Sequence, residues 1–142
     1  MRDVQMYRGS SSPFDYLVWN GHTLIGIEAK IINDKAQSKS FPFNRVSDEQ
    51  IEGMLELKEY ENSESFILIN FRWTNHKKGD TFALDVNEFL TLRDMDKEDK
   101  KTIGLNSKSI PLDFFRENVL QLPRLGKGWD LEPLVKERYF YS

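Results

Sequence analysis

The 142-residue chain has 20 Lys and Arg against 23 Asp and Glu, a net charge of −3, so any contact with nucleic acid must use local basic patches. It has no cysteine and only two histidines, which excludes disulfides, thiol catalysis and thiolate zinc sites. The length suits one domain, and because no apolar run reaches membrane-span length and no signal-peptide core is seen, we expect a cytoplasmic protein.

Residues 14–31 predict a β-hairpin, preceded by a short strand expected at residues 4–7. The pair Asn20-Gly21 separates two apolar, β-rich runs. Both residues tolerate the positive φ of a type I′ turn, so this pattern is a strong hairpin signal. The sequence therefore predicts two antiparallel strands joined by a two-residue turn.

The turn determines which side chains share a face of the hairpin. A two-residue loop would pair Asp15 with Gly26. Because side chains alternate along a strand, Asp15 would then share one face with Glu28 and Lys30, and Gly26 would put no side chain between them. The other face carries an apolar row suited to packing against a helix, namely Ile25, Ile27, Ala29 and Ile31.

The shared face suits metal-assisted chemistry. Asp15 and Glu28 would be diagonal neighbours roughly 7 to 8 Å apart, close enough to hold one Mg²⁺ or Mn²⁺ ion. Such an ion polarises a phosphate and lowers the pKa of a bound water, while Lys30 would orient that water or offset charge on phosphorus. The pattern predicts phosphodiester hydrolysis. The alternative is a solvated edge hairpin, since an E-x-K triplet often arises by chance.

Residues 32–46 predict a loop, because Pro42 disfavours both a helix and a central strand. The basic side chains in this segment are candidate nucleic-acid contacts: Lys35, Lys39 and Arg45. Phe41 and Phe43 either anchor the loop to the core or stack on bases. The sequence leaves both interpretations open.

Residues 47–61 predict a helix that begins with a capping box. Ser47 and Gln50 have the required spacing, in which each side chain bonds the other's backbone N–H. Gln50 also projects towards the sheet, within the apolar arc of the helix. It therefore either caps the helix, which the sequence favours, or reaches the acidic face and bonds a metal-bound water or phosphate.

The remaining elements predict an α/β domain with a mixed sheet flanked by helices. The apolar run 65–71 indicates a strand covered on both faces, joined to the hairpin by a crossover. We further expect a polar turn at 72–80, a strand at 81–85, a helix at 86–93, an exposed charged segment at 94–101 and a short helix from the cap Ser109 to residue 118. Lys77 and Lys78 in the turn are two more candidate nucleic-acid contacts, or are simply solvated.

An ordered set of motifs resembles one protein family over most of the chain. The set is Asp15, Glu28-Ala29-Lys30, Ser40-Phe41-Pro42-Phe43, Glu49-Gln50-Ile51 and Ile110-Pro111-Leu112. It resembles the RecU-type Holliday junction resolvases of the PD-(D/E)xK nuclease superfamily. The resemblance implies a restriction-endonuclease-like core, and residues 1–142 would form a single nuclease-like domain truncated at its N-terminus relative to the family.

The resemblance also implies roles for single residues. Asp15 and Glu28 would be metal ligands with the Ala29 carbonyl as a third, and Lys30 and Gln50 would complete the catalytic set. Mg²⁺ or Mn²⁺ would be the cofactor, and a homodimer would cut two strands of a four-way DNA junction symmetrically. One departure is Pro13-Phe14, where the family often has Ser or Thr.

The sequence therefore predicts a Mg²⁺-dependent, structure-selective DNA endonuclease. Two alternatives remain open. The first keeps the metal site but acts on other DNA, as a restriction or repair nuclease does. The second is a non-catalytic nucleic-acid-binding or interaction module on the same scaffold.

Overall fold

The computed structural model describes residues 5–7, 14–33, 39–73, 76–125, 128–129 and 131–134. The main sheet comprises β1 (Gln5–Tyr7), β2 (Tyr16–Trp19), β3 (Leu24–Asn33), β5 (Ser63–Trp73), β6 (His76–Asp85) and β8 (Leu120–Leu122), side by side in that order. Two short ribbons pair β4 (Ser40–Pro42) with β7 (Ser109–Pro111), and β9 (Arg124–Leu125) with β10 (Gly128–Trp129). The helices are η2 (Phe43–Arg45), α1 (Asp48–Lys58), α2 (Val86–Asp94), α3 (Lys97–Thr102) and α4 (Leu112–Asn118).

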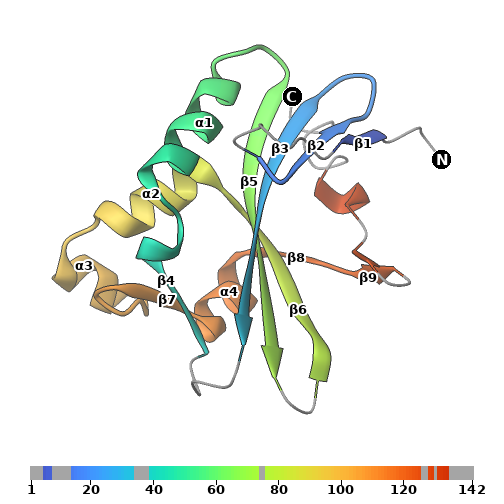
Figure 1. Cartoon of the computed structure of the whole chain (residues 1–142). Coiled ribbons are helices and arrows are strands. Elements are labelled where there is room, and N and C mark those ends of the chain that lie inside the picture. Colours follow the sequence, from blue (N-terminus) through green and yellow to red (C-terminus); the bar gives the residue numbers. More distant parts are fainter. Residues whose placement is uncertain are drawn as a thin grey trace.

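The sheet is mixed, because only one neighbouring pair of its strands is parallel. β2 and β3 form the antiparallel hairpin, and β3 then pairs with β5 in parallel after a crossover that contains α1 (Figure 1). β6 and β8 continue antiparallel. The predicted α/β class, a mixed sheet that starts with an antiparallel hairpin and is flanked by helices, is confirmed. No helix in the described part of the chain is long and apolar enough to cross a membrane.

The two faces of the sheet bury separate apolar clusters. The larger cluster packs α1, α2 and α4 against one face. On the other face Ile25 and Ile27 pack with Leu134 from the end of the described chain. Ala29 and Ile31 on that face are exposed, so the predicted apolar row of β3 is covered only along its first half.

The register of the hairpin is two residues away from the predicted one. Leu17, not Asp15, pairs with Gly26, because the strands are joined by a four-residue loop bounded by Asn20 and Thr23. The Asn20 side chain accepts a hydrogen bond from the Thr23 N–H at 2.7 Å, which closes a wider turn than the type I′ turn expected. Because two residues is the period of side-chain alternation, the shift leaves every side chain on its predicted face.

The segment around Pro42 forms a strand and a helical turn, β4 and η2, instead of the predicted loop. β4 pairs antiparallel with β7, and Pro42 is its last residue, opposite Ser109. Proline is tolerated at the end of an edge strand, where no ladder hydrogen bond is required. Ser109 therefore lies in a strand and does not cap α4; the Leu112 N–H donates instead to the Lys39 carbonyl at 2.7 Å.

The two phenylalanines beside Pro42 anchor this segment to the core. Phe41 is fully buried and Phe43 is 6% exposed. The Phe41 ring makes edge contacts with Phe89 and Phe115, with centroids 6.3 and 6.5 Å apart. Burial decides between the two interpretations of these rings, because a ring enclosed by core aromatics has no free face for a base.

We expect Phe41→Ala to destabilise the protein by about 3 to 5 kcal/mol, since it removes a buried ring and leaves a cavity. Urea unfolding followed by circular dichroism measures the change. Tyr60→Ala is the matched control, because Tyr60 is 70% exposed and should cost less than about 0.5 kcal/mol. Equal effects of the two substitutions would contradict the anchoring role.

The polar turn predicted at residues 72–80 is shorter, because β5 and β6 both continue into it. Lys77 and Lys78 belong to the backbone of β6, and their side chains lie outside the described part of the structure. The pairing of the two strands is irregular next to Phe71. Gly79 lies opposite this irregularity with φ +66°, a conformation that favours glycine.

The helix predicted at residues 47–61 is confirmed as α1, which ends at Lys58, three residues earlier than expected. Its N-terminus has both hydrogen bonds of the capping box. Asn62, with φ +58°, then turns the chain into β5. Capping thus fixes where α1 begins, and with it where Gln50 lies relative to the sheet.

Candidate active site

Asp15 is held against β3 by its backbone and its side chain. Its N–H donates to the Ile27 carbonyl at 2.9 Å, and its Oδ2 accepts from the Ala29 N–H at 2.9 Å. Asp15 comes just before the first residue of β2. Its side chain therefore accepts the hydrogen bond of a β3 N–H that a strand backbone would otherwise accept. This dual attachment fixes the carboxylate at the edge of the sheet beside Glu28.

Glu28 is a buried carboxyl, only 4% exposed, in the middle of β3. Burial, followed by a hydrogen bond and charge repulsion from Asp15, raises its pKa from 4.5 to about 7. Lys30 and Gln50 act in the opposite direction, the first through its charge and the second through a hydrogen bond. Without a cation, burial and the neighbouring Asp15 therefore favour the neutral form of Glu28.

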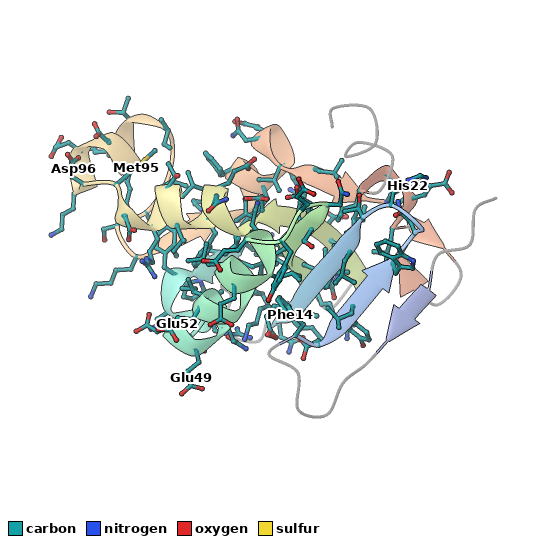
Figure 2. The ribbon with its side chains drawn as sticks, turned by 90° about the horizontal axis from the view of Figure 1, so that it is seen from above. Phe14, His22, Glu49, Glu52, Met95 and Asp96 are labelled. Atoms are coloured by element: carbon teal, nitrogen blue, oxygen red, sulfur yellow. The ribbon has the colours of Figure 1, made fainter. Side chains whose placement is uncertain are left out.

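Gly26 lies on the same face of β3 as the carboxyls, and neighbouring side chains fill the space where its own side chain would be. A Cβ at this position would lie 2.6 Å from the Phe14 ring and 2.7 Å from a methyl group of Leu57. Phe14 is buried and lies next to β3, as Figure 2 shows from above. The sequence indicated that Gly26 leaves room on this face, but gave no signal that Phe14, which precedes β2, and Leu57 from α1 close it.

We expect Gly26→Ala to destabilise the fold by about 1 to 3 kcal/mol, because the added methyl group must push aside two packed side chains. Thermal unfolding followed by fluorescence measures the loss. The double variant Gly26→Ala with Leu57→Ala should lose less stability than the sum of the two single losses, because the second change makes space for the first. Strict additivity would contradict the proposed packing.

Gln50 makes the capping contact that the sequence favours, on the helix that packs over the face of Glu28. Its Oε1 accepts from the Ser47 N–H at 3.0 Å, which is half of the capping box. Its side chain also lies near Glu28, where it acts to lower the pKa of that carboxyl against the larger effects of burial and of Asp15. Lys30, half-buried on the same face of β3, adds a positive charge close to Glu28.

The donors of this face fit a hard divalent cation. Mg²⁺ and Mn²⁺ prefer oxygen ligands, and Mg²⁺ is commonly held by one or two carboxylates with waters and substrate phosphate completing its shell. Asp15 and Glu28 supply the carboxylates. The Ala29 carbonyl points to the same edge as the Ala29 N–H that bonds Asp15. The described residues include no group of three or more acidic or histidine side chains arranged for a metal.

The candidate nucleic-acid contacts are not all gathered at this site. The Arg45 Nη2 donates to the Ile31 carbonyl at 3.2 Å, which places its guanidinium one residue beyond Lys30 along β3. Lys39 is exposed just before β4. Lys35 lies outside the described residues, as do the side chains of Lys77 and Lys78. Arg45 is thus the candidate that a hydrogen bond attaches to β3, the strand that carries Glu28 and Lys30.

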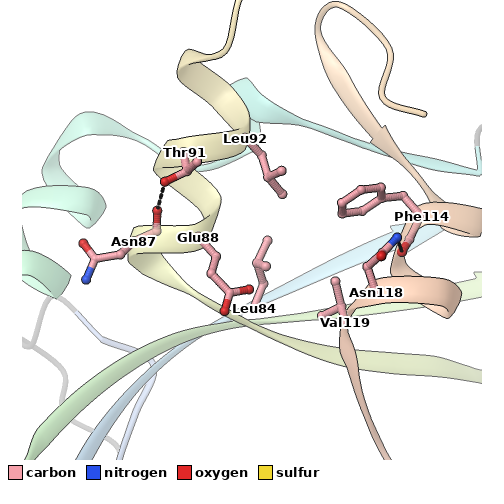
Figure 3. Close-up of a pocket in the computed structure, with 8 residues that line it drawn as sticks. All are labelled: Leu84, Asn87, Glu88, Thr91, Leu92, Phe114, Asn118 and Val119. Atoms are coloured by element: carbon pink, nitrogen blue, oxygen red, sulfur yellow. Dashed lines mark hydrogen bonds between the residues drawn. The ribbon is translucent and has the colours of Figure 1, made fainter. Parts of the chain in front are cut away.

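A cavity of about 320 Å³ lies elsewhere, between α2 and α4 (Figure 3). Its walls are mostly apolar, with Leu84, Leu92 and Phe114 among the lining side chains. None of the candidate catalytic residues lines it. The cavity therefore takes no part in the chemistry of the acidic pair.

No protein-family model matches the chain, and no curated protein matches it. Among solved structures, the chain is similar to Hjc, a Holliday junction resolvase from Archaeoglobus fulgidus, with 15% sequence identity and a TM-score of 0.44. The match covers 59% of this chain and 60% of the Hjc chain.

Proposed function

We propose that this protein is a Mg²⁺- or Mn²⁺-dependent endonuclease that hydrolyses phosphodiester bonds of branched DNA. One observation carries the proposal. The Asp15 carboxylate accepts from the Ala29 N–H at 2.9 Å and so lies beside Glu28, which is almost completely buried, while Lys30 follows on the same face of β3. Burial and the neighbouring Asp15 both disfavour the charged form of Glu28, and a divalent cation held by the two carboxyls removes that cost.

Each residue of the set has a distinct task. Asp15, Glu28 and the Ala29 carbonyl would hold the ion. A bound divalent ion supplies positive charge to the scissile phosphate and lowers the pKa of a water next to it. Lys30 places its ammonium group at the same face, where it orients the attacking water and balances charge on the phosphate oxygens.

We further propose a four-way junction as the substrate and a homodimer as the active species. The ordered motifs that resemble RecU-type resolvases support this choice. The described part of one chain holds one such site, so symmetric cleavage of two strands requires two copies. Arg45 would bind a phosphate next to the scissile one, because its guanidinium uses one donor on Ile31 and retains others.

The outer surface of α1 favours a second candidate, an interaction module without catalysis. Glu49 and Glu52 point away from the sheet in Figure 2, and Glu56 is exposed farther along the same helix. This negative surface lies next to the candidate site and repels phosphate. A protein partner with a basic surface would suit it better than DNA.

Cleavage assays distinguish these functions. Purified protein is incubated with labelled four-way junctions, linear duplex or single strands of equal length, with Mg²⁺, Mn²⁺ or chelator. We expect paired nicks in the junction only, abolished by the chelator. Cutting of all three substrates would favour a general nuclease, and binding without nicks under every condition would favour the interaction module.

We expect Arg45→Ala to weaken junction binding by roughly 1 kcal/mol, about fivefold, through loss of one phosphate contact. Fluorescence anisotropy at several salt concentrations measures this affinity. The slope of log affinity against log salt concentration should become shallower by about one. Arg93→Ala is the control, because Arg93 pairs with Asp94 at the end of α2. An unchanged salt dependence in Arg45→Ala would argue against the phosphate contact.

A further inference from the structure

Arg72, near the C-terminal end of β5, is held by a buried amide. Its Nε donates a hydrogen bond to the Asn70 Oδ1. The other end of that amide is also held, because the Asn70 Nδ2 donates to the Thr81 Oγ1 of β6 at 2.8 Å. Asn70 is 3% exposed and Thr81 is 2% exposed, whereas Arg72 is only half-buried. A buried polar pair on two neighbouring strands therefore orients a guanidinium that still reaches the surface.

The group that orients Arg72 carries no charge. Two other arginines pair with carboxylates, Arg93 with Asp94 at 2.7 Å and Arg116 with Asp80 at 3.3 Å. Arg72 has an amide oxygen in that place, and it forms no ion pair with any residue that the structure describes. A guanidinium has five N–H donors, so Arg72 retains donors and an uncompensated positive charge for an anion.

The anchored guanidinium lies across from the C-terminal end of β3, which runs side by side with β5 (Figure 1). The parallel register places Asn33 opposite Arg72 and Ile31 opposite Asn70. Because side chains alternate along a strand, this row lies on the face of the sheet opposite to Lys30. Ile31 is 42% exposed, so solvent reaches the sheet next to the arginine.

The other side of β3 is an open edge at the same end. β3 pairs with β2 only as far as Ile27, and no other strand of the described chain pairs with the rest of that edge. Arg45 reaches it, since its Nη2 donates to the Ile31 carbonyl at 3.2 Å. Two guanidiniums that bond neutral oxygens therefore flank the end of β3. A nucleic-acid backbone, with phosphates at regular intervals, is the anion that meets several such charges at once.

We propose that Arg72 is a phosphate-binding residue for DNA, oriented by Asn70, and that the DNA surface continues around the end of β3 onto the face opposite to the acidic pair. The inference rests on the proposed function, because it adds a contact to the same DNA substrate. A DNA strand that passes the open edge would meet Lys30 and Arg45 first and Arg72 beyond them. The neutral amide of Asn70 fixes the guanidinium without cancelling its charge.

Three substitutions test the proposal by fluorescence anisotropy on labelled four-way junctions, with chelator and at several salt concentrations. Arg72→Gln should weaken binding about fivefold and make the slope of log affinity against log salt concentration shallower by about one. Asn70→Asp keeps the shape but sets a carboxylate against the guanidinium, so it should reduce the slope similarly although Arg72 is present. Asn106→Asp adds the same charge at an exposed site after α3 and should leave the slope unchanged.

Thermal unfolding establishes that each variant is folded, and Arg72→Gln decides alone if Asn70→Asp does not fold. An unchanged slope in Arg72→Gln would overturn the phosphate contact, while junction cleavage by the parent would keep the proposed function. A shallower slope in Arg72→Gln but not in Asn70→Asp would overturn the orienting role of Asn70. Junction binding that depends on Arg72 without any nicks would overturn the proposed function and support the contact. A parent that binds no DNA would overturn both and favour an acidic protein partner.

Discussion

Glu28→Gln is expected to stabilise the metal-free protein by about 3 kcal/mol at pH 8, an unusual gain for a substitution in the core. The pKa of Glu28 is raised from 4.5 to about 7 by burial and by Asp15. The folded state therefore holds the proton more tightly than the unfolded state. This contribution to stability is complete below about pH 4.5 and is lost as the pH rises through about 7.

A glutamine has nearly the shape of the protonated glutamate but cannot ionise, so the variant avoids the cost of a buried charge. Urea unfolding from pH 4 to pH 8, in the presence of a chelator, should show the two proteins equally stable at the acidic end and diverging above it. Glu56→Gln on the exposed surface of α1 is the control. Parallel profiles for the parent and Glu28→Gln would show that Glu28 is not held in the environment described.

Lys30→Met should lower the rate of junction cleavage by about 10²- to 10³-fold, the usual cost of losing one preorganised group that stabilises charge in the transition state. Junction affinity should change by no more than roughly threefold, because one lysine at the cleavage point adds little to a large phosphate interface. Single-turnover cleavage and anisotropy measure the two quantities. Lys101→Met, an exposed lysine on α3, should leave both unchanged.

Other combinations of cleavage rate and junction affinity would assign Lys30 a different role. If the rate and the affinity fell by the same factor, Lys30 would act only by binding phosphate. If neither fell while the protein cleaved junctions, the chemistry would lie elsewhere in the chain. Loss of the rate alone is the result that a positioned ammonium group predicts.

The arrangement of Asp15, Glu28 and Lys30 on one face could be derived from the sequence, because it depends only on side-chain alternation in two strands. The predicted register was wrong by two residues, but an even shift conserves the faces. The first residue of α1 could also be predicted from the sequence, since Ser47 and Gln50 form a local capping motif. Local chemistry and periodicity thus placed most of the candidate site.

Features that depend on distant pairing could not be derived. Pro42 lies in a strand only because β7, far along the chain, provides the partner, and the same pairing removes Ser109 from its predicted capping position. The close packing at Gly26 likewise depends on Phe14 and on Leu57 from the helix packed over the sheet. Such contacts leave no trace in composition or spacing, because tertiary packing sets them.

The central claim, that Asp15 and Glu28 together hold one divalent ion, is tested most directly by Mn²⁺ titration calorimetry at pH 8. We expect one ion per chain in the parent protein and none in the double variant Asp15→Asn with Glu28→Gln, which should remain folded because both amides fit the same space. Unchanged Mn²⁺ binding in a folded double variant, or no binding by the folded parent, would contradict the account.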